Sequence, residues 1–305
     1  MSKLSIITIC YNEPDLEKTC ESIVNQTWQD FEWIVIDGGS NQQTLDIFEK
    51  YKDRINVYVS EPDTGRYNAF NKGLEYVNGE YVHFLNAGDY YYNENVLRDV
   101  FDSNFPNADI VHGDLYFKNT TNPEKDTIRS SNHKNICPTF FINKIVYHPA
   151  TFIKSTLFTV DDGFRFNENY KIVGDLEMWI VFAKQHAKFC HINKTISVFN
   201  MNGISENEKY RELHKKERTE VINKYFTSEE IELAKKEYKN FSMWEQIFSI
   251  TNTRNRKHKV LTILGIHIKI RKKWKRKILI DLYKDIGIGE KNEKSTNYGY
   301  NRTRW

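Results

Sequence analysis

Short apolar runs alternate with segments of helical periodicity over the first 115 residues of the chain. The apolar runs predict strands at residues 4–10, 32–37, 55–59, 81–85 and 109–115. Between them, apolar residues spaced along one helix face predict three helices, one capped by Asn12 and two at residues 44–51 and 67–77. Apolar strands that alternate with helices predict an α/β fold, a mostly parallel, Rossmann-like sheet with helices on both faces.

The second half of the chain has a less regular pattern. Residues 116–170 are polar and weakly periodic; then a helix is predicted at 176–186, a strand at 189–199, and helices at 205–225 and 228–248. We therefore expect an α/β domain over residues 1–205 and C-terminal helices over 206–250. A basic amphipathic segment over 251–285 and a mobile tail over 286–305 would follow.

The composition is that of a folded chain without a membrane span. Of 305 residues, 39% are hydrophobic and 28% are charged, which is typical of a globular protein. No apolar run approaches the roughly 18–20 residues that cross a bilayer, and no signal peptide is recognisable. The four cysteines contain no CxxC spacing, so we expect reduced thiols and a cytoplasmic location.

Polar, acid-bearing clusters follow four of the predicted strands, at residues 11–13, 37–40, 60–63 and 86–89. Ligands of open parallel sheets bind beyond the carboxyl ends of the strands, where these clusters would meet. The chain contains neither GxGxxG nor a Walker A motif, so glycine amides are not expected to hold a phosphate here. Because carboxylates and phosphates repel, a hard divalent cation, Mg²⁺ or Mn²⁺, would have to bridge them.

Four segments carry a family resemblance: residues 5–13 (SIITICYNE), 33–40 (WIVIDGGS), 60–73 (SEPDTGRYNAFNKG) and 79–89 (GEYVHFLNAGD). They resemble glycosyltransferase family 2, whose members are inverting enzymes with the GT-A fold. The last two segments are similar to a subgroup that builds bacterial surface polysaccharides of the O-antigen and capsule type. The resemblance covers roughly residues 4–205 and implies transfer of a hexosyl or N-acetylhexosaminyl group from a nucleotide-sugar, with a UDP-sugar as the expected donor.

The resemblance implies roles for the residues at the strand ends. Asp37 would accept the uracil N3–H and Tyr11 would stack on the base, while Asp89 would be the metal ligand of a motif that here reads Asn-Ala-Gly-Asp. The residues expected to contact the nucleotide-sugar are Thr8, Tyr11, Asn12, Glu13, Asp37, Asp63, Arg66, Lys72, Asn86, Ala87, Gly88 and His148.

The resemblance also implies a catalytic base at the start of the helix near residue 175. Asp175 matches the base, with Gly174 in place of the family's usual Glu and with Glu177 as the reserve candidate. Asp175 would remove the proton from the acceptor hydroxyl during a single inverting displacement.

Simpler interpretations remain open for the same residues. Asp37, Asp89 and Asp175 could each cap a turn or a helix. His148 could be a structural histidine, and the chain could be an inactive nucleotide-sugar-binding module or a nucleotidyltransferase.

Basic residues concentrate near the C-terminus, where residues 254–277 contain 11 Lys and Arg and no Asp or Glu. Apolar residues and Trp274 interleave with them, which predicts attachment to the anionic inner face of the cell membrane, beside a lipid-linked glycan acceptor. The alternative is a basic face that packs on the acidic remainder of the chain. Nucleic-acid binding is not expected, because no nucleic-acid fold signature occurs.

Overall fold

A computed structural model describes residues 2–102, 104–119, 122–132, 136–159, 163–200, 208–252, 258–263 and 266–271. The chain divides into two compact units, residues 1–239 and 240–305. The first unit holds the sheet and most of the helices, and the second holds a small sheet.

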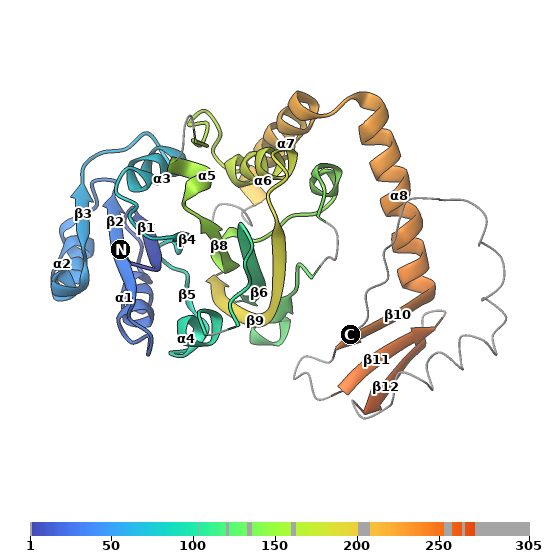
Figure 1. Ribbon diagram of the computed structural model, residues 1–305, viewed down its shortest axis with the longest axis horizontal. Coiled ribbons are helices and arrows are strands. Elements are labelled where there is room, and N and C mark those ends of the chain that lie inside the picture. The colour runs from blue at the N-terminus through green and yellow to red at the C-terminus, as the bar shows by residue number, and fades with distance from the viewer. Residues whose placement is uncertain are drawn as a thin grey trace. The chain divides into compact units, whose positions relative to one another are not determined.

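The first unit is built on a nine-stranded sheet in which β8 interrupts two groups of parallel strands (Figure 1). Its strands are β1 (Leu4–Cys10), β2 (Phe31–Asp37), β3 (Val57–Ser60), β4 (Tyr81–Phe84), β5 (Tyr90–Tyr91), β6 (Ile110–Lys118), β7 (Thr127–Arg129), β8 (Thr151–Lys154) and β9 (Phe189–Asn200). The order is β3-β2-β1-β4-β8-β6-β9-β5, with β7 beside β6. Strands β3, β2, β1 and β4 are mutually parallel, β6 and β9 are parallel, and β8 runs antiparallel to β4 and β6.

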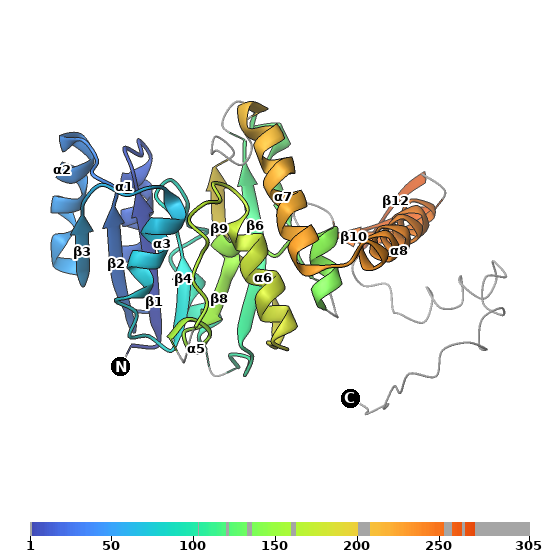
Figure 2. The same cartoon turned by 90° about the horizontal axis from the view of Figure 1, so that it is seen from above.

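Helices cover both faces of this sheet (Figure 2). The helices in the described part of the chain are α1 (Leu16–Val24), α2 (Gln42–Lys50), α3 (Arg66–Leu74), α4 (Val96–Val100), α5 (Thr156–Thr159), α6 (Gly174–Lys184), α7 (Arg211–Tyr225) and α8 (Ser228–Ile247). Short 3-10 turns occur at Lys52–Arg54, Pro123–Lys125, Pro138–Ile142, His148–Ala150 and Glu208–Tyr210.

Alternating side chains of the strands supply two separate cores. In β1, Leu4 and Ile6 pack into the core formed with α1, α2 and α4, whereas Ile7 packs into the core formed with α3, α6 and α7. This two-sided burial explains why the strands have continuous apolar sequences. The predicted α/β sheet is confirmed, and the strands in the first half of the chain agree best with the prediction.

Strand β8 was not predicted, because its sequence of four residues gives no recognisable period within a polar region. Thr151, Phe152 and Ile153 are nevertheless completely buried between β4 and β6. The position of β8 matters for the site, since the His148–Ala150 turn leads directly into it.

The first compact unit extends beyond the domain end predicted at residue 205. Val221 and Phe226 follow that boundary and are buried in the same core as α3 and α6, together with Ile231 and Ala234 of α8. Helix α7 is therefore part of the fold that carries the site, and α8 leads from this unit into the second.

The second unit contains three antiparallel strands: β10 (Phe248–Asn252), β11 (His258–Ile263) and β12 (Ile266–Arg271). Their register pairs Ile250 with Leu261, and Leu261 with Ile268. The predicted basic segment is thus partly a sheet, while Trp274 and the predicted tail over residues 286–305 lie outside the described residues. Within the described ranges, no helix has both the length and the apolar composition needed to cross a membrane.

Candidate functional site

The turns after β1, β2 and β4 meet at one edge of the sheet. Asn12 links the first two turns: its backbone N–H donates to the Ser40 hydroxyl at 2.8 Å, and its side-chain oxygen accepts from the Asn41 N–H at 2.7 Å. Asn12 has a left-handed φ of 51°, so it does not cap a helix as predicted, and α1 begins only at Leu16. On the other side of β1, the Ala87 N–H donates to the Ile9 carbonyl at 3.0 Å.

Asp37 caps the turn that follows β2 and still has one oxygen left over. Its Oδ2 accepts from the Gly39 and Ser40 N–H groups at 3.2 and 3.1 Å, and from the Ser60 hydroxyl at 2.7 Å. Its Oδ1 is buried and has no hydrogen-bond partner in the described part of the chain. The capping role therefore involves Oδ2 alone, and Oδ1 is suited to accept a hydrogen bond from an N–H group of a ligand. Tyr11 lies 66% exposed in the neighbouring turn.

The other residues predicted near the nucleotide have different surroundings. Asp63 lies against Gly38, where an added Cβ would come within 2.5 Å of its Oδ2. Thr8 is completely buried and accepts a hydrogen bond from the Trp33 ring nitrogen at 3.0 Å, so it offers no surface to a ligand. Lys72 is already paired with Glu61 at 2.6 Å, and a phosphate could recruit it only by breaking that ion pair.

The Asn86–Asp89 turn is held from two distant elements. The Thr19 hydroxyl of α1 accepts from the Gly88 N–H at 2.9 Å and donates to the Asp89 carbonyl at 2.7 Å. The Asn200 side chain, at the end of β9, donates to the Gly88 carbonyl at 2.8 Å. Sequence reasoning missed both residues, although a threonine on the apolar face of α1 was a usable signal.

Burial dominates the electrostatics of Asp89, which is 6% exposed. Loss of solvent raises the pKa of its carboxyl to about 8; the Asn200 backbone N–H opposes this shift, Glu13 adds to it, and Arg66 opposes it. Burial also raises the pKa of Glu13, which lies against Gly88. Two carboxyl groups with raised pKa values, close enough to interact, indicate a place where a positive charge is needed.

The oxygen atoms at this turn fit a hard divalent cation. Asp89 supplies a carboxylate, and Asn86 Oδ1 is buried without a hydrogen-bond partner among the described residues. Oxygen donors of this kind suit Mg²⁺ or Mn²⁺. No group of three or more His, Cys, Asp or Glu in the described ranges could hold a metal ion by itself, so phosphate and water oxygens would have to complete the coordination.

His148 links this turn to Asp175. Its Nε2 lies 3.3 Å from Asn86 Nδ2, and its Nδ1 lies 3.3 Å from Asp175 Oδ2. A single tautomer satisfies both contacts, because Nδ1–H then donates to the carboxylate while Nε2 accepts from the amide. The structure therefore brings together three residues that were predicted from widely separated motifs.

Glu177, the reserve base, has a different environment. It is 3% exposed, and its Oε1 accepts from Lys224 Nζ at 2.7 Å and from the Tyr225 hydroxyl at 2.9 Å. The Asp175 side chain is 18% exposed and contacts His148, so it is the acid of this helix that a substrate can reach.

Two buried residues that the sequence analysis missed support the His148–Asp175 pair. The neutral His83 ring lies 3.0 Å from the Pro149 carbonyl and 2.9 Å from the Tyr91 hydroxyl, and burial lowers its pKa to about 4. The Tyr67 hydroxyl accepts from the Gly174 N–H at 2.7 Å. An added Cβ at Gly174 would come within 2.7 Å of the Tyr67 ring, so this close approach favours glycine at position 174.

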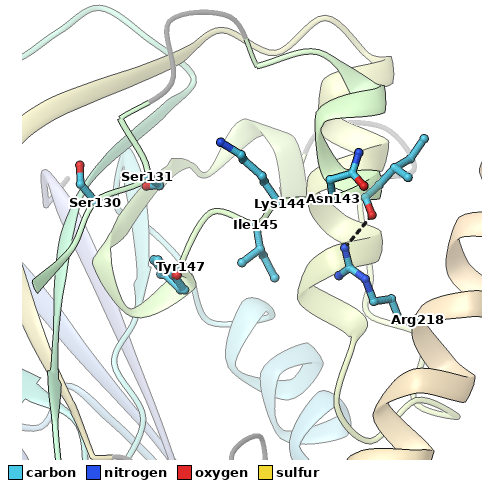
Figure 3. A pocket seen from close by; sticks show the side chains of 8 residues that line it. Ser130, Ser131, Asn143, Lys144, Ile145, Tyr147 and Arg218 are labelled. Carbon is cyan, nitrogen blue, oxygen red and sulfur yellow. Dashed lines mark hydrogen bonds between the residues drawn. The ribbon is translucent and has the colours of Figure 1, made fainter. Parts of the chain in front are cut away.

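A cavity of about 560 Å³ lies next to the segment that carries His148 (Figure 3). Its walls include Ser130, Ser131, Lys144, Tyr147 and Arg218. Hydroxyl, ammonium and guanidinium groups give it a polar lining, of the kind that receives a hydroxyl-rich ligand.

Comparison with protein families and with known proteins agrees with the fold and the motifs. The model of the family described as "Glycosyl transferase family 2" matches residues 5–162, slightly more than half of the chain.

Among curated proteins, a PGL/p-HBAD biosynthesis glycosyltransferase of Mycobacterium bovis is 30% identical over 181 residues. The match covers 56% of this chain and 66% of the relative, so the chain spans slightly less than two thirds of the relative's length. An uncharacterized glycosyltransferase of Methanocaldococcus jannaschii is 25% identical over 195 residues, covering 61% of this chain and 66% of that protein.

Among solved structures, residues 1–349 of S. aureus TarS match with a TM-score of 0.53 at 22% identity, covering 66% of this chain and 60% of that one. A complex of the same TarS fragment with UDP-GlcNAc has the same TM-score and identity, covering 67% of this chain and 59% of that one. At this identity the likeness is one of fold alone.

The raised pKa of Asp89 predicts a specific pH dependence of stability. The folded protein holds this proton up to about pH 8, whereas the unfolded chain releases it near the ordinary value of 3.8. The folded state therefore binds more protons between these values, and stability falls as the pH rises through this window. In EDTA-treated protein, we expect Asp89→Asn to reduce the fall in Tm between pH 5 and pH 8 by at least roughly 2–4 °C, the equivalent of about 1 kcal/mol.

Thermal unfolding of both proteins at a series of pH values measures this effect. Asp53→Asn, a change of the same charge at an exposed position, is the matched control and should leave the slope unchanged. Equal slopes in the wild type and the Asp89→Asn protein would show that Asp89 has an ordinary pKa.

Proposed function

Because this chain belongs to glycosyl transferase family 2, we propose that it transfers a sugar from a nucleotide-sugar donor to an acceptor hydroxyl, with Asp175 as the base. The observation that carries the proposal is the contact series Asn86–His148–Asp175. It joins the turn suited to a donor phosphate with the partly exposed acid suited to an acceptor. Simple capping explains neither the orphaned oxygen of Asn86 nor the alignment of His148 between the two residues.

The donor proposed here is a UDP-sugar with a hexosyl or N-acetylhexosaminyl group. Asp37 Oδ1 is a buried acceptor with no partner in the described ranges, and it matches the N3–H donor of uracil. Tyr11 is exposed beside it and would stack on the base. S. aureus TarS, which is similar in fold, has been crystallised with UDP-GlcNAc.

Asp89 and Asn86 would hold Mg²⁺ or Mn²⁺ together with the donor diphosphate. When bound, the cation supplies charge stabilisation for the departing diphosphate. Arg66, at the first turn of α3, already interacts electrostatically with Asp89 and would add positive charge at the same place.

The proposed reaction is a single inverting displacement. The acceptor oxygen forms a bond to the anomeric carbon while the bond from that carbon to the diphosphate oxygen breaks, and the diphosphate leaves with the electron pair. Asp175 takes the proton of the acceptor hydroxyl. His148 donates to Asp175 Oδ2, which fixes the orientation of the carboxylate for this transfer.

The acceptor proposed is a glycan, free or lipid-linked, used in bacterial surface polysaccharides of the O-antigen or capsule type. The polar cavity lined in part by Tyr147 would receive part of such an acceptor, because its lining offers hydrogen-bond donors and cations. The M. bovis relative is named a glycosyltransferase of PGL/p-HBAD biosynthesis, which supports a role of this chain in a biosynthetic sugar transfer.

Removal of the base should affect turnover more than donor binding. We expect Asp175→Asn to lower kcat by about 10²-fold or more, the range for loss of a general base, with unchanged donor affinity. Glu177→Gln, two residues further along the same helix, is the control and should retain kcat if it remains folded. Steady-state kinetics with a panel of nucleotide-sugars and acceptors decides the matter, and an active Asp175→Asn enzyme would exclude Asp175 as the base.

Metal-dependent donor binding provides a second test. Titration calorimetry of UDP with and without Mn²⁺ should show at least about a tenfold gain in affinity for the wild type, equal to ~1.4 kcal/mol. Asp89→Ala should abolish that gain, because it removes the charged ligand of the turn. Asp53→Ala should retain it. A metal-enhanced affinity that survives in Asp89→Ala would remove this residue from the metal site.

We further propose that the second unit attaches the enzyme to the anionic inner face of the cell membrane. Its support is the charge distribution: 11 Lys and Arg with no acid between residues 254 and 277, against a balance of 3 − 11 = −8 for the remainder of the chain. Anionic lipid attracts a basic segment by about 1 kcal/mol per residue near the surface.

Liposome sedimentation of two triple variants measures this contribution. One replaces basic residues of the second unit with Gln, and the control does the same in exposed positions of the first unit. The first variant changes Lys259, Lys269 and Arg271, and the control changes Lys215, Lys216 and Lys235. We expect the first variant to bind anionic vesicles about 10²-fold less tightly and the second to be nearly unaffected; equal losses would contradict a specific role of the second unit.

A further inference from the structure

Two side chains from other helices bind four consecutive backbone N–H groups immediately before Asp175. Glu217 of α7 accepts from Lys171 and Ile172, both at 2.9 Å, and from Val173 at 3.3 Å. The Tyr67 hydroxyl of α3 accepts from the next N–H, that of Gly174. The Val173 and Gly174 N–H groups lie at the start of α6, where a helix leaves N–H groups without intrahelical partners, whereas those of Lys171 and Ile172 lie in the preceding loop. Within the local sequence, Asp175 Oδ1 accepts from the Leu176 N–H at 2.9 Å.

Glu217 is well suited to hold this loop rigidly. It is 4% exposed, and both of its oxygens are engaged, so three charge-assisted hydrogen bonds fix the backbone from residue 171 to residue 173. Hydrogen bonds are strengthened in a buried environment, and the N–H groups would be left unsatisfied without the carboxylate.

The next residue of α7 holds a second part of the backbone. Arg218 donates to the carbonyls of Phe141 and Ile142 at 3.1 and 3.0 Å, and one of these bonds is the dashed line in Figure 3. These carbonyls belong to the turn that precedes the His148 segment. Adjacent residues of one helix therefore hold the loop before Asp175 and the turn that comes before His148 in the chain.

We infer that Glu217 is a positioning residue for catalysis, which acts by fixing the backbone that carries Asp175. This inference rests on the proposed role of Asp175 as the base. It assigns α7, which lies beyond the residues matched by the family model, a function in turnover as well as in folding.

The test is Glu217→Gln in the full chain. One carboxylate oxygen becomes an amide NH₂, which faces N–H donors and cannot accept from them. We expect kcat to fall about 10- to 100-fold, the scale of small misplacements at a reacting centre, with the donor KM within about twofold of wild type. Hydrogen exchange of the amides of residues 171–173 should accelerate. Glu220→Gln, an exposed change on the same helix, should alter none of these quantities.

A double variant distinguishes positioning from general destabilisation. If Glu217 acts through Asp175, adding Glu217→Gln to Asp175→Asn should cause no further loss of kcat, whereas independent effects would multiply. A multiplicative loss, or a Glu217→Gln enzyme with wild-type kcat beside an impaired Asp175→Asn enzyme, overturns the inference and leaves the proposed function intact. Wild-type kcat in Asp175→Asn overturns both.

If Glu217→Gln does not fold, Glu217→Asp provides the same test. Its carboxylate keeps the charge but is one methylene shorter, so it reaches fewer of the three N–H groups. We expect an intermediate kcat with unchanged donor KM and intermediate amide exchange. Wild-type values for both kcat and exchange in this variant would overturn the inference.

Discussion

The contact of His148 with both Asn86 and Asp175 connects two parts of the chain that the topology builds separately. Asn86 follows a parallel strand of the first half, and Asp175 opens a helix of the second half. His148 can reach both because its turn leads into β8, which runs antiparallel beside β4. A displacement of β8 would separate the donor side of the proposed reaction from its base.

Buried polar groups give this edge its rigidity. His83 stays neutral because of its burial and holds the Pro149 carbonyl, Thr19 and Asn200 hold the Gly88 backbone, and Glu217 holds the approach to α6. The polar groups that make these hydrogen bonds find their partners within the fold. By contrast, Asp37 Oδ1 and Asn86 Oδ1 have no partner among the described residues, which costs on the order of 1–3 kcal/mol for each buried group. A ligand that supplies an N–H donor and a cation would recover part of that free energy, so the unsatisfied atoms favour donor binding.

The agreement between sequence and fold is best where local pattern and burial coincide. β1, β2 and β4 are apolar on both faces, and their ends were predicted to within about two residues. The disagreements occur where long-range contacts decide the structure. β8 has too few residues to show a period, Asn12 adopts a left-handed φ to bond with the next turn, and α7 belongs to the core of the first unit although it follows the predicted boundary. The basic segment includes β11 and β12, and the alternating sequence of β12 (IHIKIR) is that of a paired strand.

The sequence by itself determined the α/β class and the sheet edge where polar residues gather, because strand periodicity is a local property. The resemblance of its motifs to a family added Asp37, Asn86, Asp89, His148 and Asp175 as candidates. Tertiary structure decided how these residues are arranged. Asp37 caps its turn with one oxygen while the other has no partner in the described part of the chain, burial raises the pKa of Asp89, and Glu177 pairs with Lys224, away from the His148 contact. The tertiary structure also brings Tyr67 and Glu217 to the N-terminus of α6. These outcomes depend on which side chains are buried together, and residues more than 100 positions apart, such as Tyr67 and Gly174, become neighbours only when the sheet and its helices pack.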